Sequence, residues 1–134
     1  MPESRDWAIN WESDLPVAVA TEKIEKEAAA HGMRVLTAHD VSATLREKGF
    51  ESPEYRIVEV CNAKYAHQAI AVDPMVGLWM PCPIAIYEQN GKTKVTTVKT
   101  TLLADFFPNV EIAPLAAEIQ GLIVEIIEAA LKTT

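Results

Sequence analysis

The segment that follows Pro114 constrains the fold of this chain most strongly, because its apolar residues recur at helical spacing. Proline suits the first turn of a helix, where its missing N–H leaves no hydrogen bond unmade. A helix with such a wide apolar stripe has to bury it, and the face of a β-sheet offers enough surface. The stripe consists of Leu115, Ile119, Leu122, Ile123, Ile126, Ile127, Ala130 and Leu131.

Five upstream segments have the composition or the alternation of β-strands. In the first, Trp7, Ile9 and Trp11 alternate with smaller or polar residues, which predicts a strand with an aromatic face. The last two are separated by a turn that contains Asn90-Gly91, and Asn-Gly is the strongest short-range signal for a β-hairpin. The expected strands are residues 6–12, 33–37, 55–61, 84–88 and 93–101.

Helices are predicted in the intervals between these strands. Side chains that can cap a helix N-terminus precede three of them, namely Ser13-Asp14, Asp40 and Asn62. The first expected helix covers residues 15–31 and ends at Gly32, and the second is a short amphipathic helix after Asp40, with Val41 and Leu45, that ends at Gly49. The third covers residues 63–71 and ends at Asp73-Pro74, and the fourth is the helix that Pro114 opens. Residues 103–110 are expected to form a loop or a helical turn.

This order of elements predicts an α+β fold, in which the long C-terminal helix packs across one face of an antiparallel sheet of about five strands. A chain of 134 residues suits a single domain over residues 1–134. No apolar run approaches the ~18 residues of a membrane span, so none is expected. The start of the chain lacks a signal-peptide pattern, so a cytoplasmic location is the default, and a periplasmic one would follow if a leader had been removed.

The net charge and the exposed edges of the predicted sheet indicate which binding partners to expect. A formal net charge of −7 opposes binding to nucleic acid, so no nucleic-acid partner is expected. A sheet of about five strands leaves two edge strands, and subunit pairing often hides such surfaces. A homodimer is therefore expected, with Trp7, Trp11 and Trp79 as candidate interface residues.

Two cysteines are the residues most able to do chemistry. Cys61 ends a predicted strand just before a predicted helix, and helix N-terminal amides favour a thiolate. Cys82 lies between Pro81 and Pro83, which restrict the local backbone. Each thiol also has a plainer interpretation, because free cysteine is among the most buried residue types and packs as a small hydrophobe.

His67 and Met80 lie close to these cysteines in the sequence. His67 could join Cys61 as a metal ligand or act as its base, although a histidine on a short helix more often lies at the surface. Met80 could contact a soft metal or a haem. The sequence has no H-x-x-x-H, C-x-x-C or glycine-rich phosphate loop, which excludes zinc-finger, thioredoxin and P-loop assignments.

A series of short motifs runs in order from roughly Trp7 to Leu131. Its members include Val35-Leu36-Thr37, Asp40-Val41, Thr44-Leu45-Arg46-Glu47-Lys48, Tyr55-Arg56-Ile57, Cys61-Asn62, Ala66-His67, Asp73-Pro74, Gly77-Leu78, Pro81-Cys82 and Tyr87-Glu88. This series resembles the domain-of-unknown-function 302 family. The resemblance implies a fold like one repeat of the TATA-box-binding protein, with a curved antiparallel sheet backed by the C-terminal helix, and it implies a homodimer. It does not imply DNA binding, because fold is not function.

The chain departs from this family at two positions. Members often have proline after Cys-Asn and asparagine after Pro-Cys, where this chain has Ala63 and Pro83. Pro83 removes a backbone donor beside Cys82. A role that needs a donor at this position is therefore not expected.

Three hypotheses follow for function. The first is a small homodimeric protein that binds a small ligand, a metal or a haem, with the balance of features against an enzyme. The second is a thiol-based redox or sulfur-handling protein with Cys61 as nucleophile and Cys82 as resolving thiol. The third is an interaction dimer without chemistry. The binding or redox candidates are Cys61, Asn62, His67, Met80, Pro81 and Cys82, and the metal-ligand candidates are Cys61, Cys82 and His67.

Overall fold

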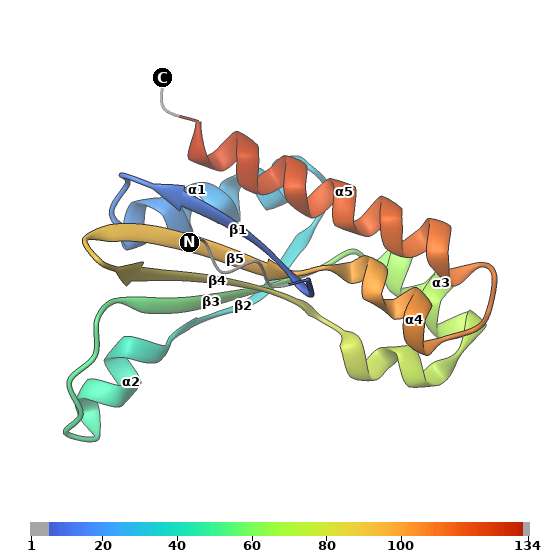
Figure 1. Ribbon diagram of the computed structural model, residues 1–134, viewed down its shortest axis with the longest axis horizontal. Coiled ribbons are helices and arrows are strands. Elements are labelled where there is room, and N and C mark those ends of the chain that lie inside the picture. The colour runs from blue at the N-terminus through green and yellow to red at the C-terminus, as the bar shows by residue number, and fades with distance from the viewer. Residues whose placement is uncertain (1–5, 133–134) are drawn as a thin grey trace.

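The computed structural model describes residues 6–132, which form one five-stranded antiparallel sheet with helices packed on it (Figure 1). The strands lie in the order β1-β5-β4-β3-β2, so β1 and β2 are the edges. The elements are β1 (Ala8–Ser13), α1 (Val17–Ala30), β2 (Arg34–Asp40), α2 (Val41–Glu47), β3 (Tyr55–Cys61), α3 (Ala63–Val72), the 3₁₀-helix η1 (Pro74–Trp79), β4 (Cys82–Gln89), β5 (Lys92–Val98), the 3₁₀-helix η2 (Thr100–Leu102), α4 (Leu103–Phe106) and α5 (Ile112–Leu131). The predicted α+β fold class is confirmed.

The predicted hairpin joins β4 to β5. Gln89 pairs with Lys92, so the connection has two residues. Asn90 and Gly91 have φ of 54° and 77°. Positive φ at both central residues matches the right-handed twist of the strands, and asparagine and glycine tolerate it best. The Asn-Gly signal therefore fixes the register of these two strands.

The main core lies between one face of the sheet and the helices α1 and α5, which pack on that face (Figure 1). Val58 and Ile84 are opposite each other in the β3–β4 ladder, and Ile86 is opposite Val95 in the β4–β5 ladder, so their side chains point to the same side. All four are fully buried. Each such side chain stabilises the fold by about 1.5–3 kcal/mol relative to an exposed one. From the helices, Ile24, Ile123, Ile126 and Ile127 complete this layer.

A smaller second core lies at one end of the sheet. It packs α3, η1 and α4 against the N-terminal part of α5, as Figure 1 shows at the end where these helices gather. Its buried residues are Ala69, Val76, Leu103, Phe107, Ile112 and Ala116. The two cores are therefore bridged by α5, and the ends of β3 and β4 lie where they meet.

The other face of the sheet carries half-buried side chains. Tyr55 and Tyr87 stack there with their ring centroids 5.1 Å apart and an interplanar angle of 14°. Ile57 is opposite Ala85 in the β3–β4 ladder, and both are only partly buried. Among residues 6–132, no helix covers the middle of this face (Figure 1). One face of the sheet is thus partly uncovered.

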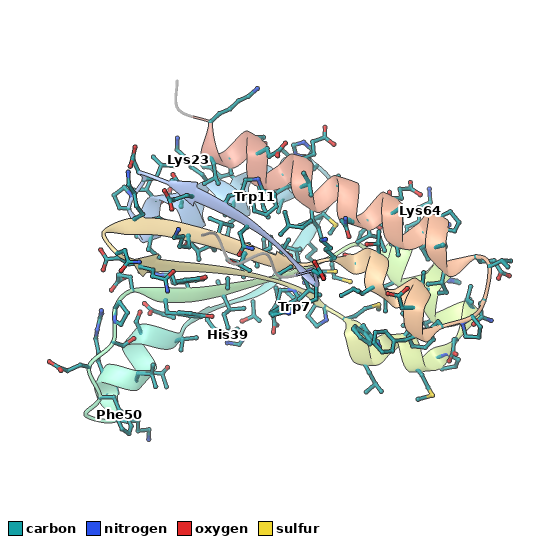
Figure 2. All side chains as sticks on the ribbon, viewed as in Figure 1. Trp7, Trp11, Lys23, His39, Phe50 and Lys64 are labelled. Atoms are coloured by element: carbon teal, nitrogen blue, oxygen red, sulfur yellow. The ribbon has the colours of Figure 1, made fainter. Side chains whose placement is uncertain are left out.

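The helix α2 differs from its prediction as an amphipathic helix. Its buried residue is Ser42, whereas Leu45 is 37% exposed. The Ser42 hydroxyl donates to Asp40 Oδ1 at 2.6 Å and accepts from the Tyr55 backbone N–H at 3.1 Å. Polar contacts therefore attach α2 to β3, and Phe50 lies exposed near its far end (Figure 2).

Several element boundaries also differ from those predicted. The strand β2 continues to Asp40, because its pairing with β3 resumes after an irregularity between Val35 and Thr37. The strand β5 ends at Val98. Residues 74–79 form η1, where no element was expected. The helix α1 begins without a side-chain cap, and α5 begins at Ile112, ahead of Pro114. None of the helices in the described part of the chain combines the length and the apolar content needed to cross a membrane.

Candidate functional site

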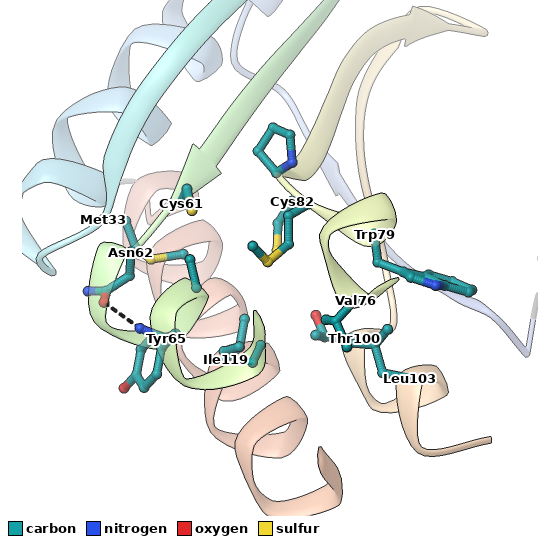
Figure 3. A pocket seen from close by; sticks show the side chains of 14 residues that line it. Met33, Cys61, Asn62, Tyr65, Val76, Trp79, Cys82, Thr100, Leu103 and Ile119 are labelled. Carbon is teal, nitrogen blue, oxygen red and sulfur yellow. Dashed lines mark hydrogen bonds between the residues drawn. The ribbon is translucent and has the colours of Figure 1, made fainter. Parts of the chain in front are cut away.

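A small pocket lies at the junction of the two cores, and four sulfur-bearing side chains line it (Figure 3). We call it the sulfur pocket and define it by Met33, Cys61, Met80 and Cys82. Most of its wall is apolar and comes from α3, η1, α4 and α5. The other lining residues are Asn62, Tyr65, Ala66, Ala69, Val76, Trp79, Pro81, Thr100, Leu103 and Ile119.

The two cysteines reach this pocket from neighbouring strands. Cys61 is the last residue of β3 and Cys82 is the first of β4. Val60 is directly opposite Cys82, so Cys61 is one position further along the ladder. In a continuing ladder, adjacent residues would point to opposite faces. The ladder stops at this point, and both thiols border the same pocket. Neither cysteine forms a disulfide in the described part of the chain.

The end of α1 places Met33 at the pocket. Gly32 has φ of 78° and its N–H donates to the Ala29 carbonyl, while the Met33 N–H donates to the Ala28 carbonyl at 2.8 Å. This is a Schellman motif, in which a glycine in the left-handed region ends the helix and the next residue turns back to it. Met33 is consequently buried, and its side chain packs in the main core while bordering the pocket.

Asn62 connects the parts of the pocket wall. Its side-chain oxygen accepts from the Tyr65 backbone N–H at 3.2 Å and so caps α3, as predicted. Its amide donates to the Gly32 carbonyl at 3.0 Å. The dashed line in Figure 3 marks the capping bond. Asn62 is therefore a structural residue of the pocket, which links the segment before β2 to the end of β3.

Burial, with a smaller contribution from the nearby Cys61, raises the pKa of the Cys82 thiol to about 11. An apolar environment penalises the thiolate because it lacks water or a partner to stabilise the charge. Cys82 is therefore a protonated thiol at neutral pH. This protonation state does not suit a nucleophile, which needs the thiolate form.

The size of the pocket limits what it can hold. Its empty space is about 430 Å³ when open solvent at the surface is counted, but the cavity inside is only about 40 Å³. A cavity of roughly 10–15 Å³ is the minimum for one water molecule, and sites for drug-sized ligands are about 300–1,000 Å³. The pocket therefore has room for an ion or a few atoms, and the predicted haem does not fit this conformation.

His67 does not join the cysteines. The residues of α3 that face the pocket are Tyr65, Ala66 and Ala69, which share one side of the helix. His67 is exposed and lines a separate surface groove. Among residues 6–132, no three His, Cys, Asp or Glu side chains are grouped so that they could hold a metal ion. Of the predicted ligand set, the structure thus brings Cys61 and Cys82 together and places His67 elsewhere.

The three tryptophans have different environments. Trp79 lines the pocket, is 39% exposed and packs against Phe106 with ring centroids 5.1 Å apart. Trp7 is 51% exposed, just before β1. Trp11 packs against the main core, and its Nε1 donates to Glu128 of α5 at 3.3 Å. Trp11 and Trp79 thus each have a partner within the chain, while the side chains of Trp7 and Trp79 remain partly accessible.

The sequence prediction missed several lining residues. Met33 had a signal, because an apolar residue after a helix-ending glycine commonly packs back on the helix. Tyr65 had a weaker sequence signal: it is three residues after Asn62, in the first turn of the helix that Asn62 caps. Thr100, Leu103 and Ile119 come from elements distant in the sequence, and only the tertiary packing brings them to the pocket.

The five-stranded antiparallel sheet with its helices defines an α+β protein. The family model named "Domain of unknown function DUF302" matches residues 9–130, so the chain belongs to this family. The chain is also similar to a solved structure described as "uncharacterized conserved protein DUF302 from Bacillus stearothermophilus". The two are 25% identical, with a TM-score of 0.88, and the match covers 96% of this chain and 100% of that one. No curated protein matches the chain.

Proposed function

We propose that this protein is a small non-enzymatic binding protein whose ligand lies in the sulfur pocket. The observation that carries the proposal is the convergence of Cys61, Asn62, Met80, Pro81 and Cys82, all predicted as site residues, on one cavity. Such a cavity between two cores costs packing energy, because its lining atoms lose contacts. A bound ligand would restore those contacts.

The chemistry of the lining favours binding over catalysis. No carboxylate or imidazole lines the pocket within residues 6–132. The hydroxyl of Tyr65 donates to Glu118 Oε1 at 2.9 Å, so it is already engaged. The raised pKa of Cys82 argues against its part in the redox hypothesis as the resolving thiol, because a thiol that stays protonated attacks a disulfide slowly.

The proposal includes a homodimer. It is supported by the uncovered face of the sheet, where Tyr55, Ile57 and Tyr87 are half-buried, and by the exposure of Trp7 and Trp79. Burial of such a face against a second copy would remove apolar area from water. A monomer mass by light scattering at micromolar concentration would contradict this part of the proposal.

The pocket proposal is tested by what the purified protein carries. Ala66→Leu places extra carbons in the pocket, and Ala71→Leu makes the same change on the exposed side of the same helix. Native mass spectrometry with elemental analysis should find a ligand on the wild type and on Ala71→Leu, and less on Ala66→Leu. A ligand retained equally by all three proteins would lie elsewhere and would contradict the proposal.

A further inference from the structure

The sulfur atoms of this chain are concentrated at one place. The sequence has two cysteines and four methionines, of which Met1 lies outside the described residues. Of the remaining five, the four that define the sulfur pocket line one cavity, and the fifth, Met75, is 63% exposed. The four come from three parts of the chain. Met33 lies between α1 and β2, Cys61 ends β3, and Met80 and Cys82 lie where η1 leads into β4. Apolar packing alone would accept leucine or valine at any of these positions.

Thiolate and thioether sulfur are soft ligands, and they select soft metal ions such as Cu(I). Zinc sites instead use combinations of thiolate, imidazole and carboxylate. The pocket offers two thiols and two thioethers, and no imidazole or carboxylate lines it in the described part of the chain. The donor set therefore matches a monovalent soft ion better than Zn²⁺.

The size of the cavity agrees with this choice. A cavity of about 40 Å³ holds a single ion. The wall is apolar, so uncompensated thiolates are penalised there, and a monovalent cation lowers the charge of a two-thiolate site from −2 to −1. Thioether ligands add no charge, so Met33 and Met80 could complete the coordination without a further penalty.

We propose that the sulfur pocket binds Cu(I) through the sulfur atoms of Cys61 and Cys82, with the thioethers of Met33 and Met80 completing the site. Binding involves no oxidation: each cysteine that coordinates replaces an S–H bond by an S–Cu bond, and its proton goes to solvent. Affinity consequently rises with pH, since the protons compete with the metal. This inference rests on the proposed function, because it names the ligand of the same pocket.

The test is an anaerobic titration of the reduced protein with Cu(I) against a chromophoric Cu(I) chelator. The expected stoichiometry is one ion per chain. Met33→Leu and Met80→Leu keep the apolar volume and remove the thioether, and each should weaken binding by about tenfold, equivalent to about 1.4 kcal/mol. Cys82→Ser should lose the site. Met75→Leu is the matched control and should bind as the wild type does.

X-ray absorption of the loaded wild type should show a shell of sulfur alone. Absence of binding at one equivalent, nitrogen or oxygen in the shell, or Met→Leu variants of the pocket that bind like Met75→Leu would each overturn the inference. Circular dichroism of every variant separates loss of the site from loss of the fold. If Cu(I) fails but another small ligand binds and is excluded by Ala66→Leu, the inference is wrong while the proposed function stands.

Discussion

The side-chain amide of Asn62 donates to the carbonyl oxygen of Gly32 across a distance of 3.0 Å. This bond joins two segments that are far apart in the sequence, and each carries a residue of the sulfur pocket next to it: Cys61 precedes Asn62, and Met33 follows Gly32. The same side chain caps α3. One residue thus positions two of the four sulfur atoms and starts the helix that forms one wall.

Substitution of Asn62 should separate its two roles. Asn62→Ala loses the cap and the bond to Gly32, and should lower the free energy of unfolding by about 1–3 kcal/mol. Asn62→Asp keeps an acceptor for the Tyr65 N–H but loses the donor, so its loss should be smaller. Urea denaturation measures both. Equal stability of wild type and Asn62→Ala would show that neither bond matters.

Alkylation of Cys82 should be slow at neutral pH and should accelerate steadily in alkali. Its pKa is about 11, so the thiolate fraction grows about tenfold for each pH unit below that value. Iodoacetamide labelling followed by peptide mass spectrometry gives the rate at this site. A rate that levels off between about pH 8 and pH 9, the ordinary range of a thiol, would contradict the raised pKa.

The same thiol should make stability depend on pH. The folded pKa of about 11 is above the reference value of 9.0, so the folded chain holds this proton more tightly than the unfolded chain. The stabilisation is therefore complete below about pH 9 and is lost as the pH rises through about 11. Its full size is about 3 kcal/mol. In denaturation curves at several pH values, Cys82→Ala should lose less stability than the wild type across this range, and parallel losses would contradict the prediction.

A charge on the uncovered face of the sheet should dissociate the proposed dimer. Ile57→Lys places an ammonium group among the half-buried residues of that face, and desolvating it in an interface would be costly. Val110→Lys is the control, because Val110 is 84% exposed and lies between α4 and α5. Sedimentation velocity should show a dimer for the control and a monomer for Ile57→Lys. Identical sedimentation of the two would place any interface elsewhere.

Local signals predicted those parts of the fold that depend on local chemistry. The hairpin at Asn90-Gly91, the cap at Asn62 and the full extent of β3 follow from residues that are close in the sequence. The apolar stripe of α5 predicted the packing on the sheet. Predictions failed where a tertiary contact overrides the pattern. The helix α2 has apolar residues at helical spacing, yet Ser42 is the buried one, because it bonds to Tyr55 of a neighbouring strand.

The site was only partly predictable, because tertiary packing also decides which residues line the pocket. Residues near the two cysteines in the sequence were found, since strand ends and the intervening helix keep them together. His67 does not line the pocket, because α3 turns it away from the side that carries Tyr65 and Ala66. Met33 lies just after α1 and Ile119 lies within α5, so their approach to the pocket depends on how these two helices pack.

The most direct test of the sulfur pocket is a titration followed on the methyl groups of ¹³C-labelled methionine. Cu(I), Ag(I), Zn²⁺, sulfide and small thiols are added in turn to the reduced protein. The account predicts that at least one of them shifts the Met33 and Met80 signals to saturation and leaves Met75 unchanged. It also predicts that Ala66→Leu abolishes that shift while Ala71→Leu preserves it. If no compound moves Met33 and Met80, or if Ala66→Leu responds like the wild type, the pocket is not the binding site that we propose.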